Sequence, residues 1–157
     1  MNNQEALRLS VDLLETAEAA IVTTIDSEGF PQTRAMFNLR RAEQFTGLAT
    51  LFKKHQDDFL VYFTTNTSSP KIAQIKTNPK VSVYYHKPSE FRGLMLSGEM
   101  EIVTDKTEKE RVWQKGWEMY YPAGVHDPDH TVLRLLPMAA KYYHQLQFFH
   151  FALGSPK

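Results

Sequence analysis

The sequence contains no cysteine among its 157 residues. Disulfides, thiolate catalysis and thiolate-ligated metal or iron–sulfur sites are therefore excluded. Any redox chemistry would need a bound cofactor. The sequence also lacks a glycine-rich nucleotide-binding motif, a Ser-His-Asp spacing and a basic patch interleaved with aromatic residues, so hydrolase and nucleic-acid-binding functions have no support.

Net charge is absent too, because 18 basic residues balance 18 acidic ones. Such a chain has no overall field that would draw it to nucleic acid or to an anionic membrane. The start of the sequence mixes Glu5, Arg8 and Asp12 with apolar side chains, which fits neither a signal peptide nor a membrane span. We therefore expect a cytoplasmic protein with no nucleic-acid or membrane partner.

The chain has enough apolar sequence for one core. Hydrophobic residues make up 42% of it, and its length is typical of one domain. We expect residues 1–157 to form a single domain.

Local patterns predict more strands than helices. Apolar spacing and capping residues predict helices at 4–16, from Pro70 to about 78, and at 106–115. Runs rich in β-branched and aromatic residues predict strands at 20–25, 31–39, 58–65, 80–86, 94–103, 130–136 and 139–151. The segments 40–54 and 117–129 are predicted to be irregular.

This order of elements favours a small, mainly antiparallel barrel with peripheral helices. Strands and helices do not alternate regularly, so a doubly wound parallel sheet is not expected. Side chains fill a barrel of about eight or fewer strands. A bulky cofactor would then lie in a groove outside the barrel.

The turn from Thr65 to Lys71 is a candidate anion site. The hydroxyls of Thr65 and Ser69, the Lys71 ammonium and the free N–H groups of the helix start are suited to hold a phosphate. Ser and Thr before a helix are more often ordinary caps, so both interpretations stay open. Arg34 lies on a strand with apolar neighbours and needs a partner, either a ligand phosphate or an acidic residue of the same chain.

Several motifs occur in a fixed order along the chain. They are TRAMF at 33–37, FTTN at 63–66, SPK at 69–71, NPKV at 78–81 and RGLMLSGEMEI at 92–102. Together they resemble the pyridoxamine 5'-phosphate oxidase-like, FMN-binding split barrels. The DPD sequence at 127–129 and the aromatic strand AKYY at 140–143 resemble the general stress protein branch. The resemblance covers about residues 13–143.

The resemblance implies a mainly β fold, a six-stranded antiparallel split β-barrel with peripheral α-helices, and a homodimer that holds FMN between its subunits. Arg34 and Lys71 would bind the FMN phosphate, with Ser69 adding a hydroxyl. Arg92 and Ser97 match a strand that faces the flavin of the neighbouring subunit, so they would complete that site.

The resemblance also assigns residues along the isoalloxazine ring. Ala35, Met36 and Phe37 would pass along one side of it. Thr64 and Thr65 would line its other edge.

The sequence departs from the vitamin-B6 oxidases at three places. Pro70 stands where those enzymes have a basic residue, and it removes both a charge and an N–H that could hold the phosphate. Leu39 stands where they carry a lysine near the flavin. The sequence ends at Lys157 without their C-terminal tryptophan and arginine segment. Oxidation of pyridoxamine phosphate itself is therefore not expected.

Histidines give no clear ligand set. His126 and His130 flank two aspartates, but the DPD between them favours a turn and fixes no third ligand, so no metal is predicted. His144 and His150 lie on the last aromatic strand and are interpreted as packed or surface residues rather than haem ligands.

Aromatic residues cluster after the third predicted helix. Trp113 is predicted to belong to the core. Trp117, Tyr120 and Tyr121 are equally compatible with core packing and with stacking on a ligand.

Two function classes follow. The first is an FMN-dependent oxidoreductase acting on an unknown small molecule, in which the cofactor carries the chemistry. The second is a flavin-binding stress-response protein without turnover. A further alternative is the same groove holding deazaflavin or haem. The motifs identify neither the substrate nor the electron donor.

Overall fold

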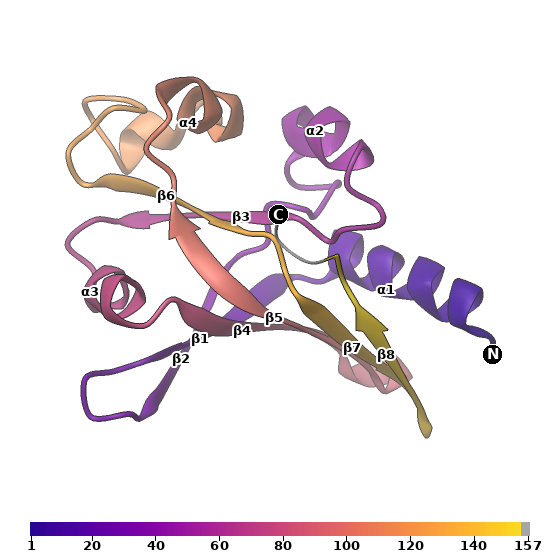
Figure 1. Cartoon of the computed structure of the whole chain (residues 1–157). Coiled ribbons are helices and arrows are strands. Elements are labelled where there is room, and N and C mark those ends of the chain that lie inside the picture. The colour runs from indigo at the N-terminus through magenta and orange to yellow at the C-terminus, as the bar shows by residue number, and fades with distance from the viewer. Residues whose placement is uncertain (155–157) are drawn as a thin grey trace.

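The computed structural model describes residues 1–154, which form eight strands and four α-helices (Figure 1). The helices are α1 (Asn3–Thr16), α2 (Ala49–Lys53), α3 (Pro70–Thr77) and α4 (Lys106–Val112). The strands are β1 (Ala19–Ile25), β2 (Pro31–Phe37), β3 (Val61–Asn66), β4 (Lys80–Lys87), β5 (Arg92–Ile102), β6 (His130–Leu135), β7 (Ala139–His144) and β8 (Gln147–Ala152). None of the helices in residues 1–154 is long and apolar enough to cross a membrane.

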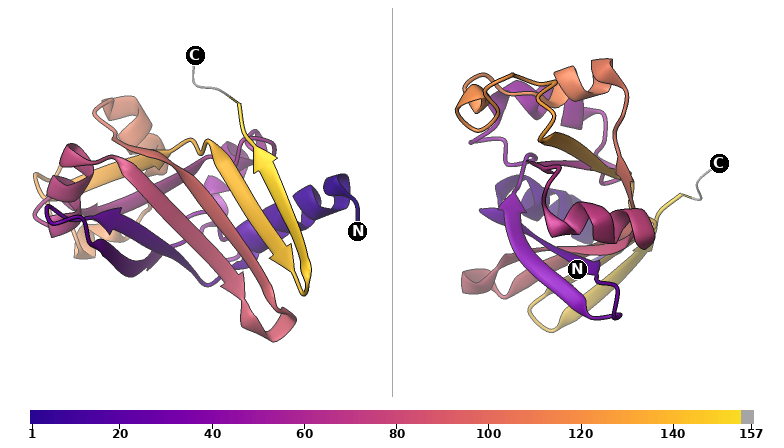
Figure 2. Two further views of the ribbon diagram at one scale, coloured as in Figure 1. Left: turned by 60° about the horizontal axis from the view of Figure 1, so that its bottom comes forward. Right: turned by 90° about the vertical axis from the view of Figure 1, so that its left-hand side faces the viewer.

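The strands form one antiparallel sheet that bends back on itself. Its order is β2-β1-β4-β5-β6-β3, and β7 and β8 form a hairpin attached to β5. The long strand β5 pairs with β4 through residues 92–99 and with β6 through residues 100–102. This change of partner brings β3 and β6 over the rest of the sheet (Figures 1 and 2). The expected mainly β, antiparallel split barrel is confirmed.

Gly98 lies next to the point where β5 changes partner. A Cβ at this position would lie 3.0 Å from Leu135 Cδ1 and 3.2 Å from Pro137 Cα. The missing side chain of this glycine therefore allows a close backbone approach.

β2 and β3 are the two ends of the strand order. Within residues 1–154, β2 pairs only with β1, and β3 pairs only with β6. The curvature of the sheet brings some residues of β2 and β3 to within 8 Å of each other, measured between Cα atoms, but the two strands do not pair. Edge strands expose backbone N–H and C=O groups. The split of the barrel therefore offers free backbone donors and acceptors on both sides.

Two apolar clusters hold the layers together. The first fills the barrel and includes Leu13 and Leu14 of α1 and Phe63 of β3. The second lies on the other face of β3 and β6, beneath α2 and α4, and includes Tyr62 and Val132. Both faces of β3 are therefore buried, which explains why its sequence is a continuous apolar run rather than an alternating one.

Four sequence predictions differ from the structure. The irregular segment 40–54 contains α2, and α4 ends at Val112 instead of near Lys115. The predicted final strand is a hairpin whose turn has Gln145 at φ 54°. A left-handed glutamine carries none of the usual hairpin signals, so the pattern missed this turn. The hairpin raises the strand number to eight in the described residues.

Candidate functional site

A groove of about 530 Å³ lies at the split between β2 and β3. This volume is within the usual range for small-molecule sites, roughly 300–1,000 Å³. Its lining residues are Glu18, Ala19, Arg34, Ala35, Met36, Phe37, Thr64, Thr65, Asn66, Lys71, Trp117, Tyr120 and Tyr121. Seven of the ten residues predicted to contact a cofactor are among them.

Lys71 is held at one end of the groove by two hydroxyls. Its Nζ donates to Thr65 Oγ1 at 2.8 Å and to Ser69 Oγ at 2.7 Å. Ser69 is the N-cap residue of α3, yet its side chain makes no capping hydrogen bond. The capping interpretation of this turn is therefore not supported, and the first N–H groups of α3 receive no side-chain cap from it.

Arg34 reaches the same end of the groove from β2. Its guanidinium donates to Thr24 Oγ1 at 2.7 Å and lies 3.5 Å from Gln74 Oε1. The Thr24 hydroxyl in turn donates to Gln74 Oε1 at 2.6 Å. Thr24 is completely buried. These neutral groups fix the direction of the guanidinium without neutralising it.

The two cations repel each other, and no carboxylate in the described part of the chain pairs with either of them. Within residues 1–154 neither Arg34 nor Lys71 forms an ion pair. Partial burial lowers the pKa of Lys71, and the charge of Arg34 lowers it further. Burial also lowers the pKa of Arg34. A bound anion would relieve both effects, so this end of the groove is electrostatically suited to a phosphate.

Aromatic side chains form the opposite wall. Trp117 and Tyr121 are largely buried, whereas Phe37 and Tyr120 are more than half exposed. The Tyr121 hydroxyl donates to Asn66 Oδ1 at 2.9 Å, which ties the loop after α4 to the end of β3. Three residues of segment 117–129, which the sequence left undecided between core and ligand, therefore belong to the groove wall.

Comparison with known proteins identifies the family. Residues 5–154 match the family described as "Pyridoxamine 5'-phosphate oxidase like". The chain belongs to this family. It is 28% identical over 105 residues to the pyridoxine/pyridoxamine 5'-phosphate oxidase of Pelagibacter ubique (strain HTCC1062), in a match that covers 67% of this chain. The match spans only 43% of that enzyme's length.

Solved structures of similar fold carry different names. A Clostridium acetobutylicum protein related to general stress protein 26 of B. subtilis is 32% identical, with a TM-score of 0.77 and 96% of each chain covered. General stress protein 26 of Bacillus anthracis str. Sterne is 18% identical, with a TM-score of 0.65 over 96% of this chain and 100% of that one. A heme binding protein of Mycobacterium smegmatis is 10% identical, with a TM-score of 0.67 over 94% of this chain and 57% of that one. The last two likenesses concern the fold alone.

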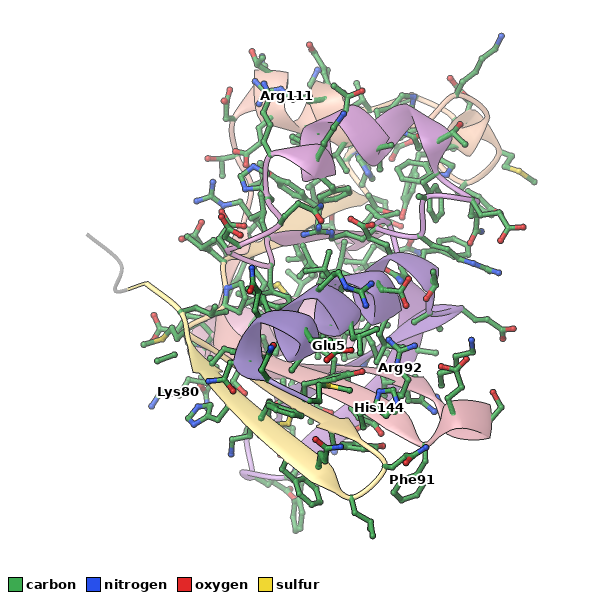
Figure 3. All side chains as sticks on the ribbon, turned by 90° about the vertical axis from the view of Figure 1, so that its right-hand side faces the viewer. Glu5, Lys80, Phe91, Arg92, Arg111 and His144 are labelled. Carbon is green, nitrogen blue, oxygen red and sulfur yellow. The ribbon has the colours of Figure 1, made fainter. Side chains whose placement is uncertain are left out.

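Arg92 does not line the groove of its own chain. Its guanidinium donates to the Leu9 carbonyl at 2.7 Å, to Glu90 at 2.9 Å and to the Tyr142 hydroxyl at 3.0 Å, and it pairs with Asp12 at 3.2 Å. Figure 3 shows it close to α1 and beside His144. Because its side chain is 5% exposed and already bonded, Arg92 connects β5 to α1 within one copy of the chain. Its predicted contact with the flavin of a neighbouring subunit stays a prediction.

Ser97 also lies outside the groove. It lines a separate hollow on the outer face of the sheet, which is the face turned away from the core of the barrel, together with Ser82 and Met138. Its distance from the groove does not test the predicted role across a subunit interface, because that role belongs to a second copy of the chain.

The histidines are held by other parts of the fold. His126 contacts Glu110 at 3.0 Å, and His130 Nδ1 contacts the Val125 carbonyl at 2.8 Å. His144 contacts the Tyr142 hydroxyl at 3.0 Å. Trp113 packs edge-on against Trp117, as expected of a core residue.

Sequence reasoning missed several residues of the site. Thr24 and Gln74 support Arg34, and Asn66 and Glu18 line the groove. Gln74 lies three residues after Lys71, on the same side of α3, so helical spacing offered a signal for it. Glu18 stands between a helix and a strand with no pattern to mark it.

Proposed function

We propose that the chain binds FMN in this groove, with the phosphate between Arg34 and Lys71. The observation that carries the proposal is a pair of adjacent, partly buried cations without a carboxylate partner in residues 1–154. Hydrogen bonds from cations to phosphate are among the strong ones in proteins. The Ser69 and Thr65 hydroxyls already orient the ammonium toward such a ligand.

The rest of the cofactor would lie along β2. From Arg34 this strand continues through Ala35 and Met36 to Phe37, and all four residues line the groove. Because β2 is an edge strand, its unpaired N–H and C=O groups are available to the polar rim of an isoalloxazine. Thr64 lines the groove from β3.

The proposed activity is that of an FMN-dependent oxidoreductase acting on a small molecule. Bound FMN supplies hydride or electron transfer. The residues of the chain hold the phosphate, orient the ring along β2 and shield it from water with the aromatic loop at 117–129.

We also propose a homodimer in which a second copy covers the outer face of the sheet. No helix lies over this face in the described residues (Figure 2). The register places one row of side chains across it: Ala35, Ile21, Tyr84, Met95, Lys141 and His150. A face with few charges suits a two-fold interface. It begins at Ala35, at the edge of the groove, and it includes Ser97, so a partner seated there would add its own residues to the site.

An FMN titration of single variants tests the phosphate position. Loss of one charged hydrogen-bonding partner costs about 1.5–3 kcal/mol, so Arg34→Ala or Lys71→Ala should weaken FMN binding by roughly 10- to 150-fold. Flavin fluorescence quenching measures this. Lys76→Ala is the matched control, because Lys76 is an exposed lysine on the same helix. Unchanged affinity in both site variants would show that the phosphate lies elsewhere.

A further inference from the structure

The aromatic wall of the groove includes a segment that pairs with no strand. Trp117, Tyr120 and Tyr121 of the groove lining all belong to residues 116–124, which we call the wall segment. In the described part of the chain, its backbone hydrogen bonds reach no further than residues 114–127. The wall segment is therefore held to the barrel by its side chains.

Both ends of the wall segment are glycines in a left-handed conformation. Gly116 has φ 99° and Gly124 has φ 85°, and a Cβ at either position would meet nothing within 4 Å. Glycine adopts such φ angles without strain, and loops that move do so through a few positions that absorb the change in φ and ψ. The wall segment can therefore swing away from the barrel once its side-chain contacts are lost.

His130, the first residue of β6, is the centre of those contacts. Its ring is 3% exposed and lies 4.6 Å from the ring of Tyr121 and 5.1 Å from that of Trp113, measured between centroids. Trp113 contacts the ring of Trp117 at 5.7 Å. His130 also pairs in register with Asn66, the β3 residue whose side chain accepts the Tyr121 hydroxyl. Two rings of the groove wall thus depend on the placement of one imidazole.

The contacts of His130 fix its protonation state. Nδ1 lies 2.8 Å from the Val125 carbonyl oxygen. Because a carbonyl only accepts hydrogen bonds, Nδ1 carries the hydrogen and Nε2 of the neutral ring has none. Nε2 is buried and has no partner in residues 1–154. Protonation would therefore add an N–H and a charge at a place without an acceptor, which is costly.

Ionisable side chains face His130 from α4 and from the loop that follows it. They are Lys109, Glu110, Tyr121, His126, Asp127 and Asp129. Burial lowers the pKa of His130, and Lys109 and His126 lower it further, against smaller opposing effects of the Val125 carbonyl and Asp127. The Asp127 carboxylate already accepts two backbone N–H groups. β3 has no ionisable side chain except Tyr62. The surroundings as a whole favour the neutral ring.

We infer that protonation of His130 releases the wall segment and opens the groove, so that the groove retains its ligand at neutral pH and loses it on acidification. The inference rests on the proposed function only for the identity of that ligand, FMN. Above the ordinary histidine pKa of about 6.5 the ring is neutral in the closed and the open state, and pH has no effect. Below it, the open state binds the proton and the closed state resists it, so the ratio of open to closed protein rises by up to about tenfold per pH unit.

The ligand-free protein provides the first test. The chain has two tryptophans, Trp113 and Trp117, and both belong to this contact network. Between about pH 7.5 and about pH 5.5, one unit on either side of the ordinary histidine pKa, their emission should shift to longer wavelength and their quenching by acrylamide should increase. Far-UV circular dichroism should stay unchanged, because the sheet remains folded. Unchanged emission and quenching would overturn the inference.

Two variants separate the imidazole from its surroundings. His130→Asn keeps an N–H donor for the Val125 carbonyl, and His130→Phe keeps a ring, but neither can be protonated. Both should give emission and quenching that do not change with pH. His126→Gln is the matched control, since His126 is an exposed histidine of the same loop, and it should respond as the wild type does. A response that persists in both His130 variants and is lost in His126→Gln would assign the switch to His126.

FMN titrations at the same two pH values connect the opening to the ligand. The FMN phosphate itself titrates near a pKa of about 6, which weakens binding by wild type and variants alike. The additional weakening in the wild type, relative to His130→Asn, should reach up to about tenfold at about pH 5.5. Equal weakening in both, without a change in emission, would overturn the inference and leave the cofactor proposal intact. If no FMN binds at either pH, the proposed function fails, while the tryptophan signals still decide whether the wall segment opens.

Discussion

At the scale of single residues, the site depends on neutral groups that orient a charged one. Gln74 accepts a hydrogen bond from the Thr24 hydroxyl and lies beside the Arg34 guanidinium, although its side chain does not line the groove. Gln74→Leu removes the acceptor and keeps most of the volume. We expect FMN affinity to fall by about three- to tenfold, since one hydrogen bond contributes about 0.5–1.5 kcal/mol. The same titration used for Arg34→Ala measures it, and a loss as large as that of Arg34→Ala would contradict a purely orienting role.

Gly93 lies at a position with no room for a side chain. A Cβ here would overlap the ring of Tyr143, whose hydroxyl pairs with that of Tyr84 on the outer face. Gly93→Ala should therefore destabilise the fold by about 1–3 kcal/mol, the usual effect of overpacking. Thermal unfolding measures this. Adding Tyr143→Ala should recover part of the loss, because the two changes share one contact; simple additivity would argue against the overlap.

At the scale of elements, the loop at 117–129 is attached through a buried histidine. His130 is 3% exposed and lies between the rings of Trp113 and Tyr121, with centroid distances of 5.1 and 4.6 Å. Its Nε2 has no partner in the described residues. Burial lowers the pKa of His130, and the nearby Lys109 lowers it further. The folded protein therefore favours the neutral ring.

The lowered pKa of His130 makes the stability of the fold depend on pH. Below the ordinary histidine pKa of about 6.5, the unfolded chain binds the proton and the folded chain resists it, so stability is fully present above this pH and falls on acidification. The melting temperature should decline from about pH 6.5 downward. His130→Phe should flatten that decline, whereas His86→Gln, at an exposed position on β4, should not. An unchanged slope in His130→Phe would assign the effect to other groups.

The elements also show what sequence could and could not predict. The groove-lining role of Arg34 to Phe37 on β2 could be predicted because the TRAMF motif, the strand after it and SPK occur in a fixed order. Strands and helix starts also have local sequence signatures. Gln145 and α2 were missed because a left-handed glutamine and a five-residue helix are set by packing and not by local pattern. The contacts of Arg92 with α1 were not predicted, because a motif gives the strand of a residue but not the side chains that pack against it.

At the scale of the whole molecule, the proposed dimer places a second copy on the outer face of the sheet. Met95 lies in the middle of the row that runs from Ala35 to His150. Met95→Glu should convert the dimer to a monomer, because an unpaired charge would be buried at the interface. Light scattering measures the mass. Thr50→Glu, at an exposed position of α2, should remain dimeric. A wild-type monomer would contradict the dimer outright.

The groove between β2 and β3 is proposed to hold FMN. The most direct measurement is the visible absorbance of the purified protein after incubation with FMN and removal of free ligand. We predict flavin bands that remain with the wild-type protein and are lost from the Arg34→Ala, Lys71→Ala double variant. A wild-type protein that retains no flavin would contradict the claim, and so would a double variant that retains as much flavin as the wild type.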